Sequence, residues 1–390
     1  MKDLLLLTVG TGTAGPASNL TLGLIHTIQQ IKPRAYWLIP SSSPDALAIA
    51  QLVREAIPDS FMPWTEESPY PIIDDHDQLE RSRAVVREVI RRVRKQLRTG
   101  ERLLVNPTSG TKQMSGGATL AALDEQVGDI IFTVGQRQDG VVIAGQERLT
   151  AFDPALYFAE RDLTLARDLF RAGSWKAAAR VLEPHPAHQK QHALCLCRWE
   201  WSRLAYAEAA RHAARFSEPI RAHLSALARS AENGGLAEVL IWDLLENADD
   251  FFGRGDTDTA AILAYKALEH GVRLRLLQTA GIAPPYLAES FAQFALSHGL
   301  QDRLAAVSSD GKVRPGLRLL FELLQALGDP MAVGYLRDRE LQKGLTERNQ
   351  TAHEISPADP KKVGPLLARV RALCADHFEH RSGPARPSDF

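Results

Sequence analysis

A short segment near the C-terminus contains side chains suited to cutting RNA without a metal ion. Residues 348–353 read Arg-Asn-Gln-Thr-Ala-His, so Asn349 and His353 are four residues apart and share one face of a helix. Histidine titrates near neutral pH and can transfer protons to and from ribose oxygens. Arginine can hold a phosphate with a permanent, bidentate charge. The candidate catalytic residues are therefore Arg348, Asn349 and His353.

The spacing of arginine and histidine is not specific by itself, because about one such match is expected by chance from ordinary composition. Arg180 and His185 have the same separation, but Pro184 interrupts a rigid helical display there. Arg371 and His377 are one residue further apart and form a weaker rival pair within the last predicted helix.

Two glycine-rich turns in the first third of the chain combine hydroxyl groups with uncovered backbone amides. The first turn contains Gly10, Thr11, Gly12 and Thr13. The second contains Asn106, Thr108, Ser109, Gly110, Thr111 and Lys112. Each leads into a predicted helix, whose N-terminal amides and dipole favour an anion. The turns predict a phosphate- or ribose-binding site without a metal, and simple tight turns are the alternative interpretation.

The first turn also fits the glycine pattern of dinucleotide-binding proteins, but the match is weak. That pattern requires an acidic residue at the end of the second strand, and here no carboxylate occurs before Asp45. Gly110 and Lys112 likewise lack the upstream glycine of a phosphate-binding P-loop. A dinucleotide-dependent oxidoreductase is therefore disfavoured.

Alternating strand and helix signals predict that residues 1–150 form an α/β domain. Strands are expected at 3–10, 35–41, 60–64, 102–106, 129–134 and within 141–149, and helices at 16–31, 44–56, 76–98 and 113–126. This order predicts a Rossmann-like, mostly parallel, doubly wound sheet. In such a sheet the ligand binds beyond the carboxyl ends of the strands, where both turns lie.

After residue 150 the strand signals stop and all-α structure is expected. We divide this part into a helical connector (151–235), a second helical domain (236–380) and a flexible, proline-containing tail (381–390). The pattern Phe-x-x-Gly-Ser at 170–174 is echoed by Phe-x-x-Gly-Asp at 252–256. The echo predicts two helix–turn–helix units with the same turn.

Composition excludes several classes of protein. The formal net charge is -1, which argues against a DNA-coating or bulk nucleic-acid-binding protein but not against a local RNA site. The three cysteines form no zinc-site spacing and are expected to be buried thiols in a reducing compartment. The opening apolar run is too short to span a bilayer. We expect a cytoplasmic protein without membrane contacts.

The turns and the C-terminal segment together resemble the CRISPR-associated CARF–HEPN ribonucleases, over most of the chain. Residues 8–13 with the strand before them, and especially residues 106–112, look like the ligand loops of the CARF domain. Residues 348–353 look like the HEPN catalytic motif in its Arg-Asn form. Residues 252–256, with Tyr265, Lys266 and Glu269, look like an earlier HEPN helix, although Lys266 stands where an arginine is expected.

The resemblance implies a type III antiviral defence protein that cyclic oligoadenylate activates, with cyclic tetra-adenylate favoured over hexa-adenylate. It implies a homodimer that pairs Arg348 and His353 across an interface and cuts single-stranded RNA, leaving a 2′,3′-cyclic phosphate. No metal or cofactor is implied. Slow cleavage of the activator by the N-terminal domain is a further hypothesis, with Thr11, Asn106 and Thr108 as candidates.

Two functions of different classes follow. The first is an activator-dependent endoribonuclease. The second is a non-catalytic nucleotide sensor that regulates a partner or a promoter, in which the helical half serves for dimerisation or docking. No DNA-reading helix is evident for the second, and a cleavage assay separates the two.

Overall fold

A computed structural model describes residues 3–11, 17–138, 141–143, 146–232, 235–284, 286–287, 291, 293–294, 297, 299–300, 308–309, 312–313, 315–351, 357–380 and 383–387. At 17–18, 137–138, 141, 215, 287, 308–309, 312 and 347–351 it describes the backbone alone. The chain forms two compact units, Met1–Glu160 and Arg161–Phe390. Within the described residues, no helix combines the length and apolar character needed to cross a bilayer.

The first unit is built on a five-stranded sheet in the order β2-β1-β3-β4-β7. Its strands are β1 (Leu4–Val9), β2 (Ala35–Pro40), β3 (Leu103–Asn106), β4 (Asp129–Val134) and β7 (Arg148–Phe152). The first four strands pair in parallel, and β7 runs antiparallel to β4. The predicted mostly parallel sheet is confirmed.

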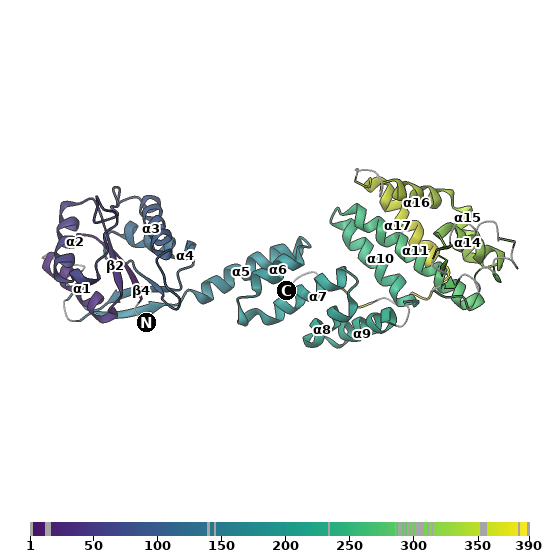
Figure 1. The fold of residues 1–390 in the computed structure, drawn as a ribbon, viewed down its shortest axis with the longest axis horizontal. Helices are drawn as coiled ribbons and strands as arrows, with labels where there is room; N and C mark the ends of the chain where they lie inside the picture. The colour runs from purple at the N-terminus through teal and green to yellow at the C-terminus, as the bar shows by residue number, and fades with distance from the viewer. Residues whose placement is uncertain are drawn as a thin grey trace. The chain divides into compact units, whose positions relative to one another are not determined.

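Helices cover both faces of this sheet (Figure 1). Leu4 and Leu6 of β1 face a core formed with α3 (Leu79–Arg94) and α4 (Lys112–Asp124). Leu5 and Leu7 face the opposite core, formed with α1 (Ala17–Ile31) and α2 (Pro44–Ala56). Because both faces are buried, β1 is apolar at every position except Thr8 rather than alternating between apolar and polar residues.

Several predicted bounds in this unit differ from the structure. The strand expected at 60–64 is a 3-10 turn, Pro58–Ser60, followed by a single bridge between Phe61 and Tyr36. The strand expected within 141–149 is divided between Val141–Val142 (β6), paired with Arg137–Gln138 (β5), and β7, which extends to Phe152. The pairing of Phe152 with Ile130 extends the sheet past the predicted boundary at 150.

The second unit begins with helices in a row: α5 (Ala155–Arg171), which crosses the boundary between the units, α6 (Trp175–Leu182), α7 (Gln189–Ser202), α8 (Tyr206–His212) and α9 (Glu218–Glu232). Its C-terminal part consists of α10 (Glu238–Gly253), α11 (Thr257–Ala280), α14 (Leu317–Ala326), α15 (Pro330–Arg337), α16 (Arg339–Thr351) and α17 (Pro360–Ala375). One apolar core joins α10, α11, α14 and α17, with Leu245, Leu268 and Phe321 among its buried residues. The predicted helical character is confirmed.

The two predicted helix–turn–helix units have turns of the same conformation, and a third unit has it too. Gly173 and Gly255 have φ of +76° and +82°, and Leu204, between α7 and α8, has φ of +63°. At each turn the next residue's N–H donates to a carbonyl five residues earlier, as in a Schellman motif. The sequence pattern missed the third turn because leucine takes the position that glycine usually occupies.

Three features of this half go beyond the predicted helices. A small antiparallel sheet consists of β8 (Tyr286–Leu287), β10 (Lys312–Val313) and β9 (Ser308–Ser309). Tyr286 and Val313 pair in it and are buried in the domain core. The connector is grouped with the domain that follows it in one compact unit. In the tail, the Arg386 side chain is 8% exposed and forms an ion pair with Asp243.

Candidate functional site

The two predicted ligand turns lie against each other at the carboxyl ends of β1 and β3. These strands are neighbours and parallel, so Gly10 and the turn after Asn106 leave the sheet at the same edge. A Cβ atom on Gly10 would lie 2.3 Å from the Cα atom of Gly110, and the Gly10 N–H donates to Ser109 Oγ at 3.2 Å. No side chain larger than hydrogen fits at Gly10 without moving one of the turns.

The side chain of Asn106 shapes the second turn from inside. Asn106 is buried, its Nδ2 donates to Thr133 Oγ1 at 2.9 Å, and its Oδ1 accepts from the Thr108 N–H at 3.0 Å. The Thr133 N–H in turn donates to Thr108 Oγ1 at 2.8 Å. These bonds tie β3 to β4, and a hydroxyl that accepts a bond keeps its own proton for another acceptor. Asn106 therefore positions the turn, and Thr108 retains a donor.

The start of α4 is the part of this turn that faces solvent. Thr111 is the N-cap residue: its Oγ1 accepts from the Met114 N–H at 3.2 Å and donates to the His76 carbonyl at 2.7 Å. Gly110 has φ of +131° and is exposed, as are Lys112 and Thr11. The edge thus presents a cation, a glycine and the positive end of a helix dipole, which suit a phosphate. Gly12 and Thr13 lie outside the described residues.

The end of β2, where dinucleotide-binding proteins have an acidic residue, is covered by another segment of the chain. Ser41 is buried and bridges Ile73. The Ile73 N–H donates to the Pro40 carbonyl at 2.9 Å, and the Ser42 N–H donates to the Ile73 carbonyl at 3.0 Å. The chain around Ile73 therefore covers this strand end and confines the open edge to β1, β3 and β4.

Thr8 begins the first glycine-rich turn and lies next to this edge. Its side chain is buried, and Oγ1 has no hydrogen-bond partner among the described residues. It lies two residues before Gly10, in a strand that is otherwise leucine and valine. Because a buried hydroxyl without a hydrogen-bond partner is uncommon, Thr8 is a candidate to contact a ligand. In the sequence it is marked as the single hydroxyl of an apolar strand.

The C-terminal motif lies at the end of α16. This helix includes the backbone of Arg348 and Asn349, which confirms the helix expected there. The side chains of Arg348 and Asn349 lie outside the described part of the chain, as does His353 as a whole. The structure therefore describes a helical backbone for residues 348–351 of the motif.

The chain on both sides of the motif is anchored to neighbouring helices. Before it, Gly344 lies against α17, where an added Cβ would be 3.3 Å from Leu366. After it, the Ala358 N–H donates to Asp258 Oδ1 at 2.8 Å, and the Ala358 carbonyl accepts from Thr257 Oγ1 at 2.7 Å. Thr257 is buried at the start of α11. The motif is thus bracketed by two fixed points.

The rival arginine–histidine pairs have other partners. Arg371 forms an ion pair with Asp249, and burial lowers the pKa of His377. His185 Nε2 lies 2.9 Å from Asp162 Oδ2. These contacts connect helices to one another and give no shared arginine–histidine site.

Among the described residues, the cysteines and the acidic and histidine side chains suggest no second chemistry. All three cysteines are buried, and burial raises the pKa of Cys195, Cys197 and Cys374 to about 12, so they are poor nucleophiles. In the described ranges, no three His, Cys, Asp or Glu side chains gather as metal ligands would.

Comparison with known proteins bears on both halves. Residues 235–376 match the family model of the Csm6 HEPN domain. The solved structure of Enterococcus italicus Csm6 bound to cyclic hexa-2′-fluoro-hexa-dAMP is similar to this chain, with a TM-score of 0.57 and 13% sequence identity. The similarity covers 97% of this chain and 94% of that chain. No curated protein sequence matches.

The chain thus has the fold of Csm6, with a Rossmann-like sheet followed by helices. Its C-terminal helices are similar to the Csm6 HEPN domain over residues 235–376.

Proposed function

We propose that this protein is an endoribonuclease that cyclic oligoadenylate switches on in type III CRISPR antiviral defence. The observation that supports this most strongly is the Csm6 HEPN match over residues 235–376, which contains the motif at 348–353. The backbone of Arg348 and Asn349 lies in the last turn of α16. The chain beyond the motif is held by a hydrogen bond at Ala358. The substrate is single-stranded RNA.

In the proposed reaction, His353 removes the proton of a ribose 2′-hydroxyl and a proton is returned from His353 to the leaving 5′-oxygen. Arg348 stabilises the charge on the phosphorus oxygens, and Asn349 orients one of the reacting groups. The oxygen of the 2′-hydroxyl displaces the 5′-oxygen, so the products are a 2′,3′-cyclic phosphate and a free 5′-hydroxyl. Two copies of the chain pair their motifs in a homodimer.

The activator site lies at the edge formed by the turns after β1 and β3. The exposed Thr11, Gly110 and Lys112, with the N-terminus of α4, would bind phosphates, while Gly10, Asn106, Ser109 and Thr111 hold the turns in place. We propose cyclic tetra-adenylate as the ring. The cyclic hexa-adenylate analogue bound to Enterococcus italicus Csm6 favours the alternative, hexa-adenylate.

The deciding experiment is cleavage of a fluorogenic single-stranded RNA in EDTA, with and without each ring. Cleavage should require one ring size, and the Arg348→Ala/His353→Ala double variant should lose at least about a hundredfold in rate. Full activity of the double variant would reject the assignment. Binding of a ring without any cleavage would favour the second candidate, a non-catalytic sensor or docking protein.

We also propose that the N-terminal domain slowly cuts its own activator, with Thr11 and Thr108 near the scissile ribose. Asn106 contributes by positioning, since both ends of its amide bond within the protein. Chromatography of the ring after long incubation with the Arg348→Ala/His353→Ala variant checks this. Recovery of the intact ring would count against it.

A further inference from the structure

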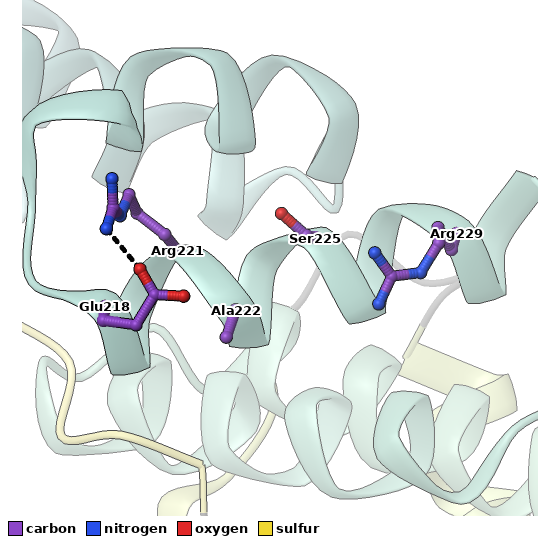
Figure 2. Close-up of a pocket in the computed structure, with 5 residues that line it drawn as sticks. All are labelled: Glu218, Arg221, Ala222, Ser225 and Arg229. Carbon is purple, nitrogen blue, oxygen red and sulfur yellow. Dashed lines mark hydrogen bonds and ion pairs between the residues drawn. The ribbon is translucent and has the colours of Figure 1, made fainter.

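We infer that one face of α9 in the connector is a binding site for the phosphate backbone of single-stranded RNA, remote in sequence from the catalytic motif. The inference rests on the proposed function, which makes RNA the substrate. The face lines a hollow of about 480 Å³ with Glu218, Arg221, Ala222, Ser225 and Arg229. Figure 2 shows these side chains along one helix, with Ser225 between the two guanidinium groups.

The packing of α9 fixes which face is turned to solvent. Leu224 and Leu227 are fully buried, and Ile220 and Ala228 pack against the same core as Trp201. The lining residues recur every three or four positions on the other side of the helix, as one stripe. The helix cannot rotate to hide its arginines without exposing that core.

The charges along the stripe favour an anion. Arg221 forms an ion pair with Glu218, which leaves the far side of its guanidinium fork available. In the described chain, no hydrogen bond or ion pair is recorded for the side chains of Arg229 and Ser225. By contrast, the exposed Arg211 pairs with Glu208 three residues earlier. A cation and a hydroxyl that line one hollow and bond to no described side chain suit phosphate oxygens.

The length of the stripe indicates a polymer rather than a single phosphate. Arg221 and Arg229 are eight residues apart, which corresponds to a rise of about 12 Å along a helix. One phosphate group is too small to contact both guanidinium groups at that separation. A backbone that runs along the groove can contact both, which is how proteins follow single strands without reading sequence.

Equilibrium binding of a fluorescein-labelled single-stranded RNA tests the inference. All proteins include Arg348→Ala/His353→Ala to keep the RNA intact, and titrations run from low to moderate salt. Arg221→Gln/Arg229→Gln should weaken binding about tenfold at low salt. It should also reduce the slope of log K against log salt by about 1.4, because about 0.7 is lost per phosphate contact on a single strand.

Two variants serve as controls. Arg211→Gln removes an exposed, already paired arginine from the neighbouring α8 and should change neither the affinity nor the slope. Arg221→Lys/Arg229→Lys keeps both charges and should restore most of the salt slope. An affinity and slope equal to the parent's for the glutamine pair would overturn the inference, as would an equal effect of Arg211→Gln.

Failure of this site and failure of the proposed function are distinguishable. If the natural chain cuts RNA but the glutamine pair binds RNA normally, the α9 site is rejected and the nuclease stands. If RNA binding depends on Arg221 and Arg229 while no ring induces cleavage, the site stands and the nuclease is rejected. If the chain binds no RNA, the site is rejected in either case.

Discussion

Arg386, near the C-terminus, donates from Nη2 to Asp243 Oδ1 at 2.6 Å, across 143 residues of sequence. The carboxylate is fully buried on α10 and also accepts from Trp201 Nε1 and Tyr206 OH, each at 2.8 Å. The guanidinium lies over the Trp201 ring, 4.8 Å from its centre. Through this ion pair and these two hydrogen bonds, the Asp243 carboxylate joins α10 to α7, to α8 and to the C-terminal segment.

The balance of charges explains why Asp243 stays ionised. Burial raises the pKa of Asp243, but the charge of Arg386 and the hydrogen bonds from Trp201 and Tyr206 outweigh burial, so the pKa lies below its ordinary value. A buried charge that loses its partner is strongly unfavourable. The stability of the second unit should thus depend on Arg386.

Arg386→Ala should lower the free energy of unfolding by about 3–5 kcal/mol, the usual cost of removing one partner of a buried pair. Urea denaturation followed by circular dichroism measures this. Arg211→Ala, which removes one partner of an exposed pair, should change it by less than about 1 kcal/mol. Equal stabilities of the two variants would show that the Arg386 contact contributes nothing in solution.

Gly10→Ala should disturb the activator site, because its Cβ would lie 2.3 Å from the Cα of Gly110. We expect a loss of about 1–3 kcal/mol in stability from the overlap. Affinity for the activating ring should fall at least about tenfold, or about 1.4 kcal/mol, because the turns must separate. Isothermal titration calorimetry with the ring measures this.

Gly116→Ala is the matched control for that substitution. Gly116 lies within α4, and an added Cβ would meet only Leu79 Cδ1 at an ordinary 3.4 Å. Alanine also favours a helix over glycine. The affinity of the Gly116→Ala variant for the ring should be unchanged. A loss of affinity equal to that of Gly10→Ala would mean that ring binding does not depend on the contact between the two turns.

Thr257→Val should slow RNA cleavage about tenfold without changing affinity for the ring, by removing the donor to the Ala358 carbonyl at 2.7 Å. The chain after the catalytic motif then loses one of its two bonds to α11, and small displacements at a reacting centre have large effects on rate. Single-turnover kinetics with saturating ring measure the change.

Thr259→Val is the control variant. It lies two residues later on α11 and removes a hydroxyl that forms no hydrogen bond to a described residue. It should cleave at the parental rate. Normal cleavage by Thr257→Val would show that the bond to Ala358 does not position the motif.

His270 should make stability depend on pH. Burial, together with the charge of Arg273, lowers the pKa of His270 to about 4, and its Nε2 accepts from the Ala237 N–H at 3.2 Å. The unfolded chain takes up this proton near pH 6.5, whereas the folded chain does so only near pH 4. The stabilising effect of the neutral imidazole is therefore complete above pH 6.5 and is lost as pH falls from 6.5 to 4.

The full expected loss from this histidine is about 3.5 kcal/mol, from about 1.4 kcal/mol per pKa unit, and about 2 kcal/mol of it falls above pH 5. Urea denaturation at pH 7.5 and 5 measures it. His270→Gln keeps a neutral acceptor for Ala237 but cannot titrate, so its stability should fall less between the two pH values. The same fall in both proteins would assign the pH dependence to other groups.

The sequence by itself predicted the elements whose signals are local. The apolar strands, the helix periodicity and the glycine turns identified the parallel sheet, the position of both ligand turns and the helical second half. The residues 348–353 were identified with the HEPN motif, and the family match includes them. The bounds were least accurate where tertiary pairing decides them, as in β7, whose strand is extended by its partner β4.

Only the tertiary structure decided what depends on residues far apart in the chain. Asn106 and Ser109, which the sequence predicts as ligand contacts, form bonds to Thr133 and Gly10 that hold the two turns together. The tail composition predicted flexibility, whereas the buried Asp243 binds Arg386. Leu204 adopts a left-handed turn that favours glycine. Local patterns cannot predict these contacts, because each depends on a partner brought close only by folding.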